Sequence, residues 1–380
     1  METRQDAAAL ALSALDSVLD PELRRPITEL GMVSGVRVDD DGVATVGVLL
    51  TISGCPLHQT ITADVRRALS AVEGISDVRV DLGVMTPEQR AALKEMLRGP
   101  GGAKEIPFNR PGSLTRVYAV ASGKGGVGKS SVTVNLAAAM AASGLRVGIV
   151  DADVHGFSIP GLLGITQPPT RVDEMILPPV AYGIKTISIG MFVAGNAPVA
   201  WRGPMLHRAL EQFLTDVYFG DLDVLFLDLP PGTGDIAISV AQLLPQSEIL
   251  VVTTPQAAAA DVAERAGSVA SQTGQSVAGV IENMSWLQLP TGERMELFGS
   301  GGGAIVAERL STALGRDIPL LGSIPLDVDL RTGGDDGTPV VLTPAAAVDG
   351  SAGAELRRMA AALARRPRGL SGLKLDVTPR

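Results

Sequence analysis

Short apolar runs rich in β-branched residues recur along the chain from residue 115 onward, and sequences typical of helices separate most of them. Such runs are typical of buried strands in a parallel sheet. They predict strands at residues 115–121, 146–150, 184–188, 224–227, 248–253, 276–281 and 319–324. The alternation predicts a doubly wound, mostly parallel α/β sheet, which binds its ligands at the carboxyl ends of the strands.

A different pattern at residues 1–98 predicts a small α+β domain in front of this sheet. Its expected helices are residues 7–19, 60–72 and 86–97, and its expected strands are residues 35–38, 43–52 and 77–82. Residues 99–114 are rich in Gly and Pro and predict a linker. The second domain is then expected at residues 115–366, followed by a frayed tail at residues 367–380.

A basic, mildly amphipathic helix is expected at residues 354–366, at the end of the second domain. Its apolar face consists of Ala side chains together with Leu356, Met359 and Leu363. That face is too thin for strong insertion into a membrane. We therefore expect the helix to dock on the second domain rather than to anchor the chain to a membrane.

The composition narrows the class of protein. Of the 380 residues, 46% are hydrophobic but only 3% aromatic, so the core is expected to be aliphatic. The 41 acidic residues outnumber the 32 Lys and Arg residues, which argues against a general nucleic-acid binder. The sequence shows no signal peptide, and its apolar stretches are too short to span a bilayer. The single cysteine, Cys55, excludes an internal disulfide framework and fits a reducing cytoplasm.

Residues 123–130 (GKGGVGKS) fit the phosphate-binding pattern G-x-x-x-x-G-K-[ST]. They lie between an expected strand and an Ala-rich helix, where backbone amides and the positive end of the helix favour phosphate. Lys129 is expected to reach the β- and γ-phosphates, and the Ser130 hydroxyl to hold Mg²⁺. The sequence therefore predicts a site for a nucleoside triphosphate. Its expected contacts are Gly123, Lys124, Gly125, Gly126, Val127, Gly128, Lys129, Ser130 and Ser131.

Lys124, directly after the first glycine of this loop, has two interpretations. At the start of the loop, it cannot easily fold back onto the phosphates of its own chain. It could instead cross a dimer interface and stabilise charge on the partner's nucleotide, as an arginine finger does. The alternative is a solvated loop lysine, and the spacing alone does not separate the two.

Polar residues follow three of the expected strands, where a nucleotide hydrolase needs them. Asp228 is the natural partner of Mg²⁺ through water, and Asp153 is the natural group to position the attacking water. A helix cap or a loop carboxylate is the alternative for each. The Pro- and Gly-rich run at residues 230–234 could change conformation with the γ-phosphate. The amide of Asn283 could recognise the edge of a base.

Several segments resemble the MinD/ParA/nitrogenase iron-protein superfamily, whose deviant phosphate loop has the form K-G-G-x-G-K-[ST]. The resemblance is closer to the Mrp/ApbC-type iron–sulfur cluster carrier ATPases. It rests on residues 120–130 (VASGKGGVGKS), 150–160 (VDADVHGFSIP), 201–204 (WRGP), 227–235 (LDLPPGTGD), 282–284 (ENM), 298–303 (FGSGGG) and 322–331 (GSIPLDVDLR). The first domain resembles the MIP-like iron–sulfur assembly domain often fused to these ATPases, on residues 20–23 (DPEL), 29–33 (ELGMV) and 50–57 (LTISGCPL).

The resemblance implies a nucleotide-sandwich homodimer that binds and hydrolyses ATP and transfers iron–sulfur clusters to apoproteins. Lys124 would then be the lysine that acts on the partner's nucleotide. Asp153 and Asp228 fall where the family has its switch aspartates. Asn283 falls where the superfamily contacts adenine.

One departure from the family concerns the cluster. These carriers usually hold a C-x-x-C motif shortly after the Asn-Met pair, from which a cluster bridges two subunits. Here that stretch, residues 285–293 (SWLQLPTGE), contains no cysteine. Because clusters are held mainly by Cys thiolates, the expected bridging site is absent, and Cys55 remains as the candidate iron–sulfur ligand.

Cys55 lies just before the expected helix at residues 60–72, in the loop where the first domain's family places its reactive cysteine. The N-terminus of a helix lowers the pKa of a thiol and favours the metal-binding thiolate. A partly buried small hydrophobic residue is the alternative. His58 could assist or simply lie on the surface, and His155 and His207 form no recognisable metal set with Cys55.

The leading hypothesis is an ATPase that assists the assembly or transfer of iron–sulfur clusters. The alternative is a positioning or partitioning switch of the MinD/ParA kind, which needs a membrane helix or a DNA-binding surface that the sequence does not favour. Two further hypotheses are a metabolic enzyme that activates a small substrate with ATP and an ATP-driven electron donor of the nitrogenase type. The WRGP segment disfavours the enzyme, and the missing bridging cysteines disfavour the electron donor.

Overall fold

The computed structural model describes residues 2–52, 55–98, 105–110, 112–154, 156–192, 203–232, 235–256, 265 and 269–366. The chain divides into two compact units. Unit 1 comprises Met1–Lys104, Gln167–Pro179 and Asp216–Gly220, and unit 2 comprises Glu105–Thr166, Val180–Thr215 and Asp221–Arg380. Unit 1 therefore takes in two segments from within the expected second domain. Residues 99–104 and 111 of the expected linker and the whole expected tail lie outside the described residues.

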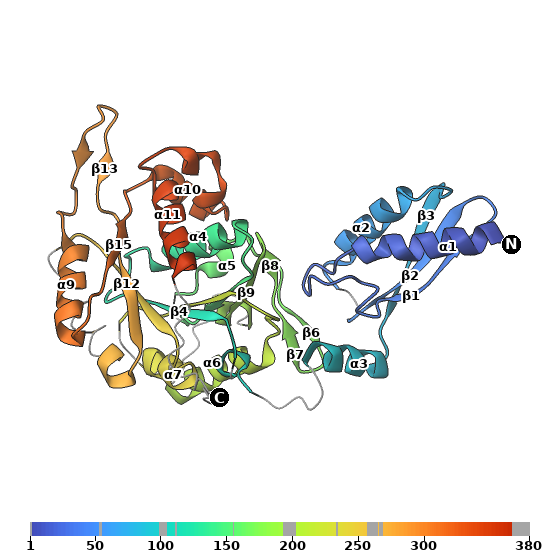
Figure 1. Cartoon of the computed structure of the whole chain (residues 1–380), viewed down its shortest axis with the longest axis horizontal. Helices are drawn as coiled ribbons and strands as arrows, with labels where there is room; N and C mark the ends of the chain where they lie inside the picture. Colours follow the sequence, from blue (N-terminus) through green and yellow to red (C-terminus); the bar gives the residue numbers. More distant parts are fainter. Residues whose placement is uncertain are drawn as a thin grey trace, which may run out of the picture. The chain divides into compact units, whose positions relative to one another are not determined.

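Unit 1 is a small α+β unit, as the sequence predicts. Its elements are α1 (Glu2–Ala14), the 3₁₀ helix η1 (Leu15–Ser17), β1 (Val33–Val38), β2 (Val43–Leu50), α2 (His58–Ser70), β3 (Asp77–Val84) and α3 (Pro87–Arg98). The three strands form a sheet in the order β1-β2-β3, with β1 antiparallel and β3 parallel to β2 (Figure 1). The helices and strands expected here are present, although the first helix begins earlier than expected, at Glu2.

The core of unit 1 forms between the sheet and α2. Every second residue of β2 from Ala44 onward is buried, because successive side chains of a strand point to opposite faces. The buried residues of α2 are Ile61, Val65 and Leu69, which are spaced by four and so share one face of the helix. Cys55 belongs to the same buried cluster.

A β-hairpin from the middle of the sequence completes this core. It consists of β6 (Thr170–Val172) and β7 (Met175–Leu177), which pair antiparallel. Its buried apolar side chains, among them Val172 and Met175, join the same cluster as the sheet and α2. Sequence analysis assigned these residues no role, because a hairpin of three-residue strands gives a weak pattern.

Polar contacts also link the hairpin to the rest of unit 1. Thr170 Oγ1 donates a hydrogen bond to the buried carboxylate of Glu22 and lies 2.8 and 2.7 Å from its two oxygens. Lys94 of α3 forms an ion pair with Glu174 at the hairpin turn. An exposed ion pair contributes little stability, so apolar burial is the main force that holds the hairpin in place.

Replacing Met175 with Ala should destabilise unit 1 by about 2–5 kcal/mol, because it removes a fully buried side chain. Cys55 is the single cysteine of the chain and lies in the same core, so its reaction with a thiol reagent across a urea series reports the unfolding of unit 1. The variant should expose Cys55 at a lower urea concentration than the wild type. Met295→Ala, which shortens an exposed methionine in unit 2, is the matched control. Equal midpoints for Met175→Ala and the wild type would show that the hairpin is not part of this core.

Unit 2 contains the expected parallel sheet. In spatial order its strands are β15 (Leu320–Ser323), β12 (Ser276–Glu282), β11 (Glu248–Thr253), β4 (Arg116–Ala121), β10 (Val224–Asp228), β5 (Val147–Asp151), β9 (Ile184–Ser188) and β8 (Val180–Ala181). Every neighbouring pair is parallel except β8 and β9. The seven strands expected from the sequence are all present, and the prediction of a mostly parallel α/β sheet is confirmed.

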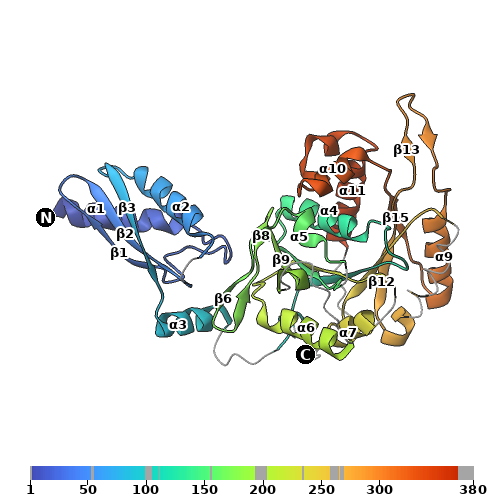
Figure 2. The same cartoon turned by 180° about the vertical axis from the view of Figure 1, so that it is seen from behind.

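Helices cover both faces of this sheet (Figures 1 and 2). One face carries α4 (Lys129–Ala142), α5 (Ile159–Leu162), α10 (Val328–Asp335) and α11 (Ala352–Arg365). The other carries α6 (Gly203–Asp216) and α7 (Asp235–Leu243), and α9 (Gly302–Leu314) packs on β12 and β15. The remaining elements are the 3₁₀ helices η2 (Pro107–Asn109), η3 (Ile189–Phe192), η4 (Val340–Leu342) and η5 (Pro344–Ala347) and the short hairpin of β13 (Leu287–Gln288) and β14 (Arg294–Met295).

The last described helix, α11, docks on the core of unit 2, as expected. Leu356, Met359 and Leu363 are buried in the cluster that also contains α4. Two side chains of β4 fix the end of the helix: Arg116 Nη1 donates to the Leu363 carbonyl at 2.6 Å, and Tyr118 Oη donates to the same carbonyl at 3.3 Å. Within the part of the chain that the structure describes, no helix has both the length and the apolar character needed to cross a membrane.

Candidate functional site

The loop between β4 and α4 has a conformation that its glycines permit. Gly126 and Gly128 both have a φ of +79°, in the left-handed region that residues with a side chain rarely adopt. Helix α4 begins at Lys129, directly after the loop, and no side chain caps its N-terminus. Gly125 and Gly126 are exposed. The loop therefore presents a glycine-rich backbone and a helix N-terminus, the combination that suits an anion.

A buried amide holds this loop from behind. Asn283 follows β12, and its Nδ2 donates a hydrogen bond to the Val127 carbonyl at 2.9 Å. A Cβ at Gly128 would lie only 2.3 Å from the same Nδ2, so a glycine is required there for packing as well as for φ. The sequence placed Asn283 at this edge of the sheet, and the structure adds its hydrogen bond to the phosphate loop. Its contact with adenine stays a prediction.

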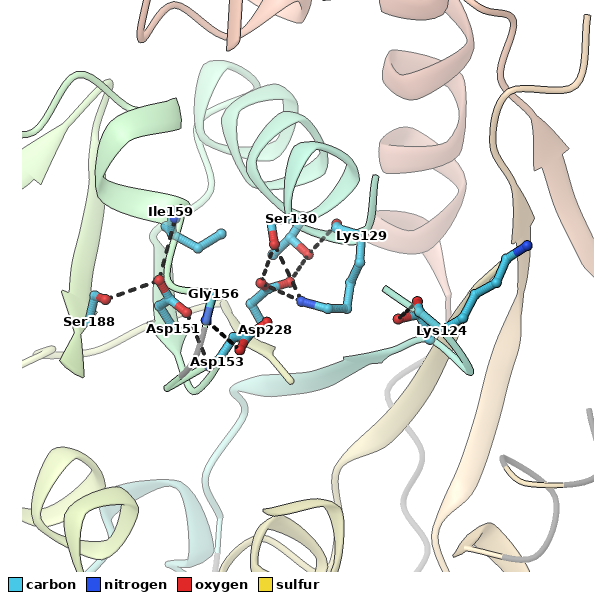
Figure 3. Close-up of polar contacts among 11 residues, drawn as sticks. Lys124, Lys129, Ser130, Asp151, Asp153, Gly156, Ile159, Ser188 and Asp228 are labelled. Carbon is cyan, nitrogen blue, oxygen red and sulfur yellow. Dashed lines mark hydrogen bonds and ion pairs between the residues drawn. The ribbon is translucent and has the colours of Figure 1, made fainter. Parts of the chain in front are cut away.

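Asp228, at the end of β10, joins the phosphate loop to the sheet (Figure 3). Its Oδ2 lies 2.6 Å from Lys129 Nζ and 2.6 Å from Ser130 Oγ, and both donate to it. Its Oδ1 accepts a hydrogen bond from Thr133 Oγ1 at 2.8 Å. Asp228 is fully buried, so its charge depends on these donors in place of water. Sequence analysis missed Thr133, although its place four residues after Lys129 on one face of a helix was a usable signal.

Two further carboxylates lie beside Asp228 at the same edge of the sheet (Figure 3). In the register of the strands Asp151 of β5 pairs with Asp228 of β10, and Asp151 is fully buried. Asp153 follows it and is also buried, and its Oδ1 accepts a hydrogen bond from the Gly156 amide at 3.0 Å. The structure thus brings together the two aspartates that the sequence selected, and Asp151, at the end of β5, lies beside both.

The buried carboxylate of Asp151 resists ionisation. Burial raises its pKa from 3.8 to about 7, and the nearby charge of Asp228 adds to the rise. Hydrogen bonds from Ser188 and from the Asp153 amide, and the charge of Lys129, oppose this rise without cancelling it. The site therefore contains a carboxyl group that changes charge near neutral pH.

The wild type should lose stability relative to Asp151→Asn as the pH rises from about 5 to about 8. The folded-state pKa of Asp151 is raised, so the stability it gives is present below the unfolded pKa and is lost as the pH rises through about 7. The measurement is the difference in melting temperature between the two proteins at each pH. Asp317→Asn, at an exposed position, reports the trend that follows the removal of any carboxylate. A difference that stays constant after this correction would show that Asp151 is already ionised at the lower pH.

Lys124 points away from this group of carboxylates (Figure 3). Its Nζ contacts Oε1 of Gln256, which lies just beyond β11. The side chain therefore does not fold back onto its own phosphate loop in this structure, in line with its expected inability to do so. Gln256 gave no sequence signal, because its partner is 132 positions away. The action of Lys124 on a partner chain stays a prediction.

The expectation of a lowered thiol pKa at Cys55 is wrong. Cys55 is only 4% exposed, and burial raises its pKa, with the charges of Glu22 and Asp20 adding to the rise. Hydrogen bonds from the backbone amides at the start of α2 do lower the pKa, as a helix N-terminus should, but burial outweighs them. In this conformation the thiol form is favoured over the metal-binding thiolate.

The two histidines that the structure describes do not complete a metal site around Cys55. The ring Nδ1 of His58 lies 2.8 Å from the backbone carbonyl of Cys55, so the ring is bonded to the backbone. His207 lies on α6 of unit 2, and His155 is outside the described residues. Among the residues that the structure describes, no group of three or more His, Cys, Asp or Glu side chains is arranged to hold a metal ion.

The stretch that replaces the family's C-x-x-C motif contains the tip of the β13–β14 hairpin, which projects from the body of unit 2 in Figure 1. The guanidinium of Arg294 lies 4.2 Å from the ring centroid of Trp286, in a cation–π contact.

Two other predicted segments are only partly described. Trp201 and Arg202 of the WRGP run lie outside the described residues, as do Thr233 and Gly234 of the Pro- and Gly-rich run.

Models of two protein families match the chain, one over most of unit 2 and one over most of the first domain. The ParA family model, described as NUBPL iron-transfer P-loop NTPase, matches residues 113–363. The chain belongs to this family. A second model, described as iron-sulfur cluster assembly protein, matches residues 9–82. The sequence-based prediction that the second domain resembles the iron–sulfur carrier ATPases and the first domain an iron–sulfur assembly domain is confirmed.

Curated relatives match 81–98% of the chain, and a solved structure matches 60% of it. The iron-sulfur cluster carrier protein of Mycobacterium tuberculosis (strain ATCC 25618 / H37Rv) is 60% identical over 374 residues, covering 98% of this chain and 97% of the relative. The protein of the same name from Bacillus subtilis (strain 168) is 42% identical over 309 residues, covering 81% and 84%. A solved structure of a nucleotide-binding protein from Archaeoglobus fulgidus in complex with ADP is 37% identical, with a TM-score of 0.52, and covers 60% of this chain and 89% of that one.

Proposed function

We propose that this P-loop NTPase hydrolyses ATP and that the ATPase cycle serves the binding of iron–sulfur clusters and their transfer to apoproteins. The observation that carries the ATPase half is the buried Asp228 carboxylate, which lies 2.6 Å from both Lys129 Nζ and Ser130 Oγ. The carrier half is supported by the relatives, which are named iron-sulfur cluster carrier proteins and match almost the full chain.

The residues of the phosphate loop fit MgATP. The open glycine backbone and the uncapped N-terminus of α4 suit the phosphates, and Lys129 would meet the β- and γ-phosphates. Ser130 would bind Mg²⁺ directly and Asp228 through water. Bound Mg²⁺ would neutralise charge on the phosphates. When the nucleotide binds, the Lys129 ammonium would give up its hydrogen bond to Asp228 and donate to phosphate oxygens instead.

Asp153 is proposed to orient the attacking water. Its carboxylate lies at the same edge of the sheet as Asp228 and is held by the Gly156 amide. A water-positioning group contributes to phosphoryl transfer through geometry, because little covalent chemistry is left for the protein to perform. Asp153 lies beside the phosphate loop, where such a water would be bound, whereas the Lys124 side chain points away from the carboxylates (Figure 3).

Lys124 is proposed to complete the site of a second copy of the chain in a homodimer. Its Nζ extends away from its own carboxylates and contacts a neutral amide, that of Gln256. Because this amide is neutral, Gln256 does not neutralise the positive charge of the Lys124 ammonium. A cation from a partner subunit can stabilise the charge that develops on the transferred phosphoryl group.

Lys129→Ala and Lys124→Ala should each abolish steady ATP hydrolysis, but a mixture of the two should recover about a quarter of the wild-type rate. Random pairing makes about half of the dimers mixed, and each mixed dimer has one site with both lysines. The measurement is phosphate release from equal amounts of the two variants after mixing. Lys94→Ala, which removes a lysine of unit 1, is the control and should keep full activity. A mixture no more active than its components would contradict the action of Lys124 across the dimer.

The cluster is the cargo of the proposed function, and Cys55 is its candidate ligand. Two copies of the chain provide only two cysteines, so an acceptor or another outside ligand must supply the rest. Because Cys55 is buried and its pKa is raised, binding requires a conformation in which the thiol reaches solvent. A single cysteine among 380 residues suits a reducing cytoplasm, where such a thiol stays free.

Anaerobic reconstitution with iron and sulfide should load the wild type with a cluster that an apo-acceptor then removes, whereas Cys55→Ala should bind and transfer much less. The measurement is the visible absorbance of the cluster, followed by the activity of the acceptor. Met175→Ala tests the role of burial and should load faster than the wild type, because it loosens the core around Cys55. If neither the wild type nor Cys55→Ala binds iron or transfers a cluster, the carrier half of the proposal is lost and the ATPase half remains. Equal loading of the two would place the cargo away from Cys55.

Among the residues that the structure describes, the packing of α11 disfavours the MinD/ParA-like positioning switch. The helix that a membrane-binding switch would use, α11, has its apolar face buried against α4. The carrier interpretation uses the same ATP site without that helix, so it agrees better with the observed packing.

A further inference from the structure

Asp151 is a fully buried carboxylate at the centre of the site to which the proposed chemistry assigns no task. We propose that Asp151 is a positioning residue for the ATPase reaction, which holds Asp153 in place through the loop that follows β5. The inference rests on the proposed ATP hydrolysis and adds a further residue to it.

The two oxygens of Asp151 bind both ends of the loop that carries Asp153 (Figure 3). Oδ1 accepts a hydrogen bond from the Asp153 amide at 3.2 Å. Oδ2 accepts one from the Ile159 amide, at the start of α5, at 3.4 Å. One carboxylate therefore ties the first and the last residues of the segment from Asp153 to Ile159 to the end of β5.

A neighbouring strand fixes the position of the carboxylate itself. Ser188, at the end of β9, pairs in register with Asp151 and donates its hydroxyl to Oδ2 at 3.0 Å. The Ser188 hydroxyl in turn accepts a hydrogen bond from the Gly190 amide at 3.2 Å. Asp151 and Ser188 are both fully buried, so water does not compete with these bonds. The anchor of the Asp153 loop thus belongs to the rigid sheet.

The loop also fits closely around the Asp153 side chain. The Gly156 amide donates to Asp153 Oδ1 at 3.0 Å. A Cβ at Gly156 would lie 3.3 Å from Asp153 Oδ2, so there is little room for a side chain between this residue and the carboxylate. A displacement of the loop would therefore displace the carboxylate that is proposed to orient the attacking water.

The contacts at position 151 use both oxygens of the carboxyl group as acceptors. Each of its oxygens faces at least one donor: a backbone amide at Oδ1, and an amide and a hydroxyl at Oδ2. Asparagine has the same size but offers one oxygen, and its NH₂ group would face an N–H donor. Asp151→Asn therefore breaks one side of the tie without changing the volume of the side chain.

The test is a double-mutant cycle in steady-state ATP hydrolysis, with the wild type, Asp151→Asn, Asp153→Asn and the double variant. Asp151→Asn should lower kcat about 10- to 100-fold and change the KM for ATP less than about threefold, because a misplaced water-orienting group impairs the chemical step. The double variant should be no slower than Asp153→Asn, since there is no longer a carboxylate to position. Independent, multiplicative losses would overturn the inference, as would an Asp151→Asn protein with wild-type kcat.

A milder pair of variants keeps the inference testable if Asp151→Asn does not fold. Ser188→Ala removes one donor to Asp151 and should lower kcat several-fold at unchanged KM. Thr186→Val is the matched control, because it removes a buried hydroxyl that has no hydrogen-bond partner, two residues earlier on the same strand. Equal kcat values for Ser188→Ala and Thr186→Val would overturn the inference. Absence of ATP hydrolysis by the wild type would instead overturn the proposed function, so the two failures are distinguishable.

Discussion

The site depends on one buried carboxylate, that of Asp228. It lies at the end of β10, between β4 and β5, and takes three donors from the first turns of α4, namely Lys129, Ser130 and Thr133. Burying a carboxylate is costly unless donors replace its lost solvation, so the burial of Asp228 depends on where α4 starts. The phosphate loop is held at its other side by Asn283. The position of the loop is thus set by polar contacts from the ends of two strands, β10 and β12, with β4 and β11 between them.

Much of this arrangement could be predicted because its signals are local in the sequence. The central strands of unit 2, such as β5, β9 and β10, are buried on both faces, and the run of β10 is a continuous apolar segment. The phosphate loop is one contiguous pattern, and the carboxyl ends of parallel strands place Asp153 and Asp228 beside it without knowledge of any contact. For the same reason the prediction of a docked α11 was sound, since its apolar face was visible in the spacing of its residues.

The contacts that could not be predicted join segments far apart in the chain. The partner of Lys124 is Gln256, and the donor to Glu22 is Thr170, 148 positions away. The prediction of the Cys55 pKa fails for the same reason. The helix N-terminus that lowers this pKa is local in the sequence, whereas the burial that raises it depends on the whole core of unit 1. A sequence pattern shows which groups a residue has nearby along the chain, but the dielectric environment is a property of the folded unit.

The connectivity of the chain links the ATP site to the domain that contains Cys55. Two donors reach Asp151 Oδ2, the Ile159 amide at the start of α5 and the Ser188 hydroxyl at the end of β9. Between these two residues the chain passes through the β6–β7 hairpin, which completes the core of unit 1. The hairpin is therefore covalently continuous, on both sides, with segments that the Asp151 carboxylate holds. A change in the Asp153 loop that moves either donor must be absorbed in the segments that lead into the hairpin, residues 160–169 and 178–187, or be passed on to it. In the proposed ATPase cycle, this covalent continuity would be the path from the Asp153 loop to the hairpin whose side chains share a core with Cys55.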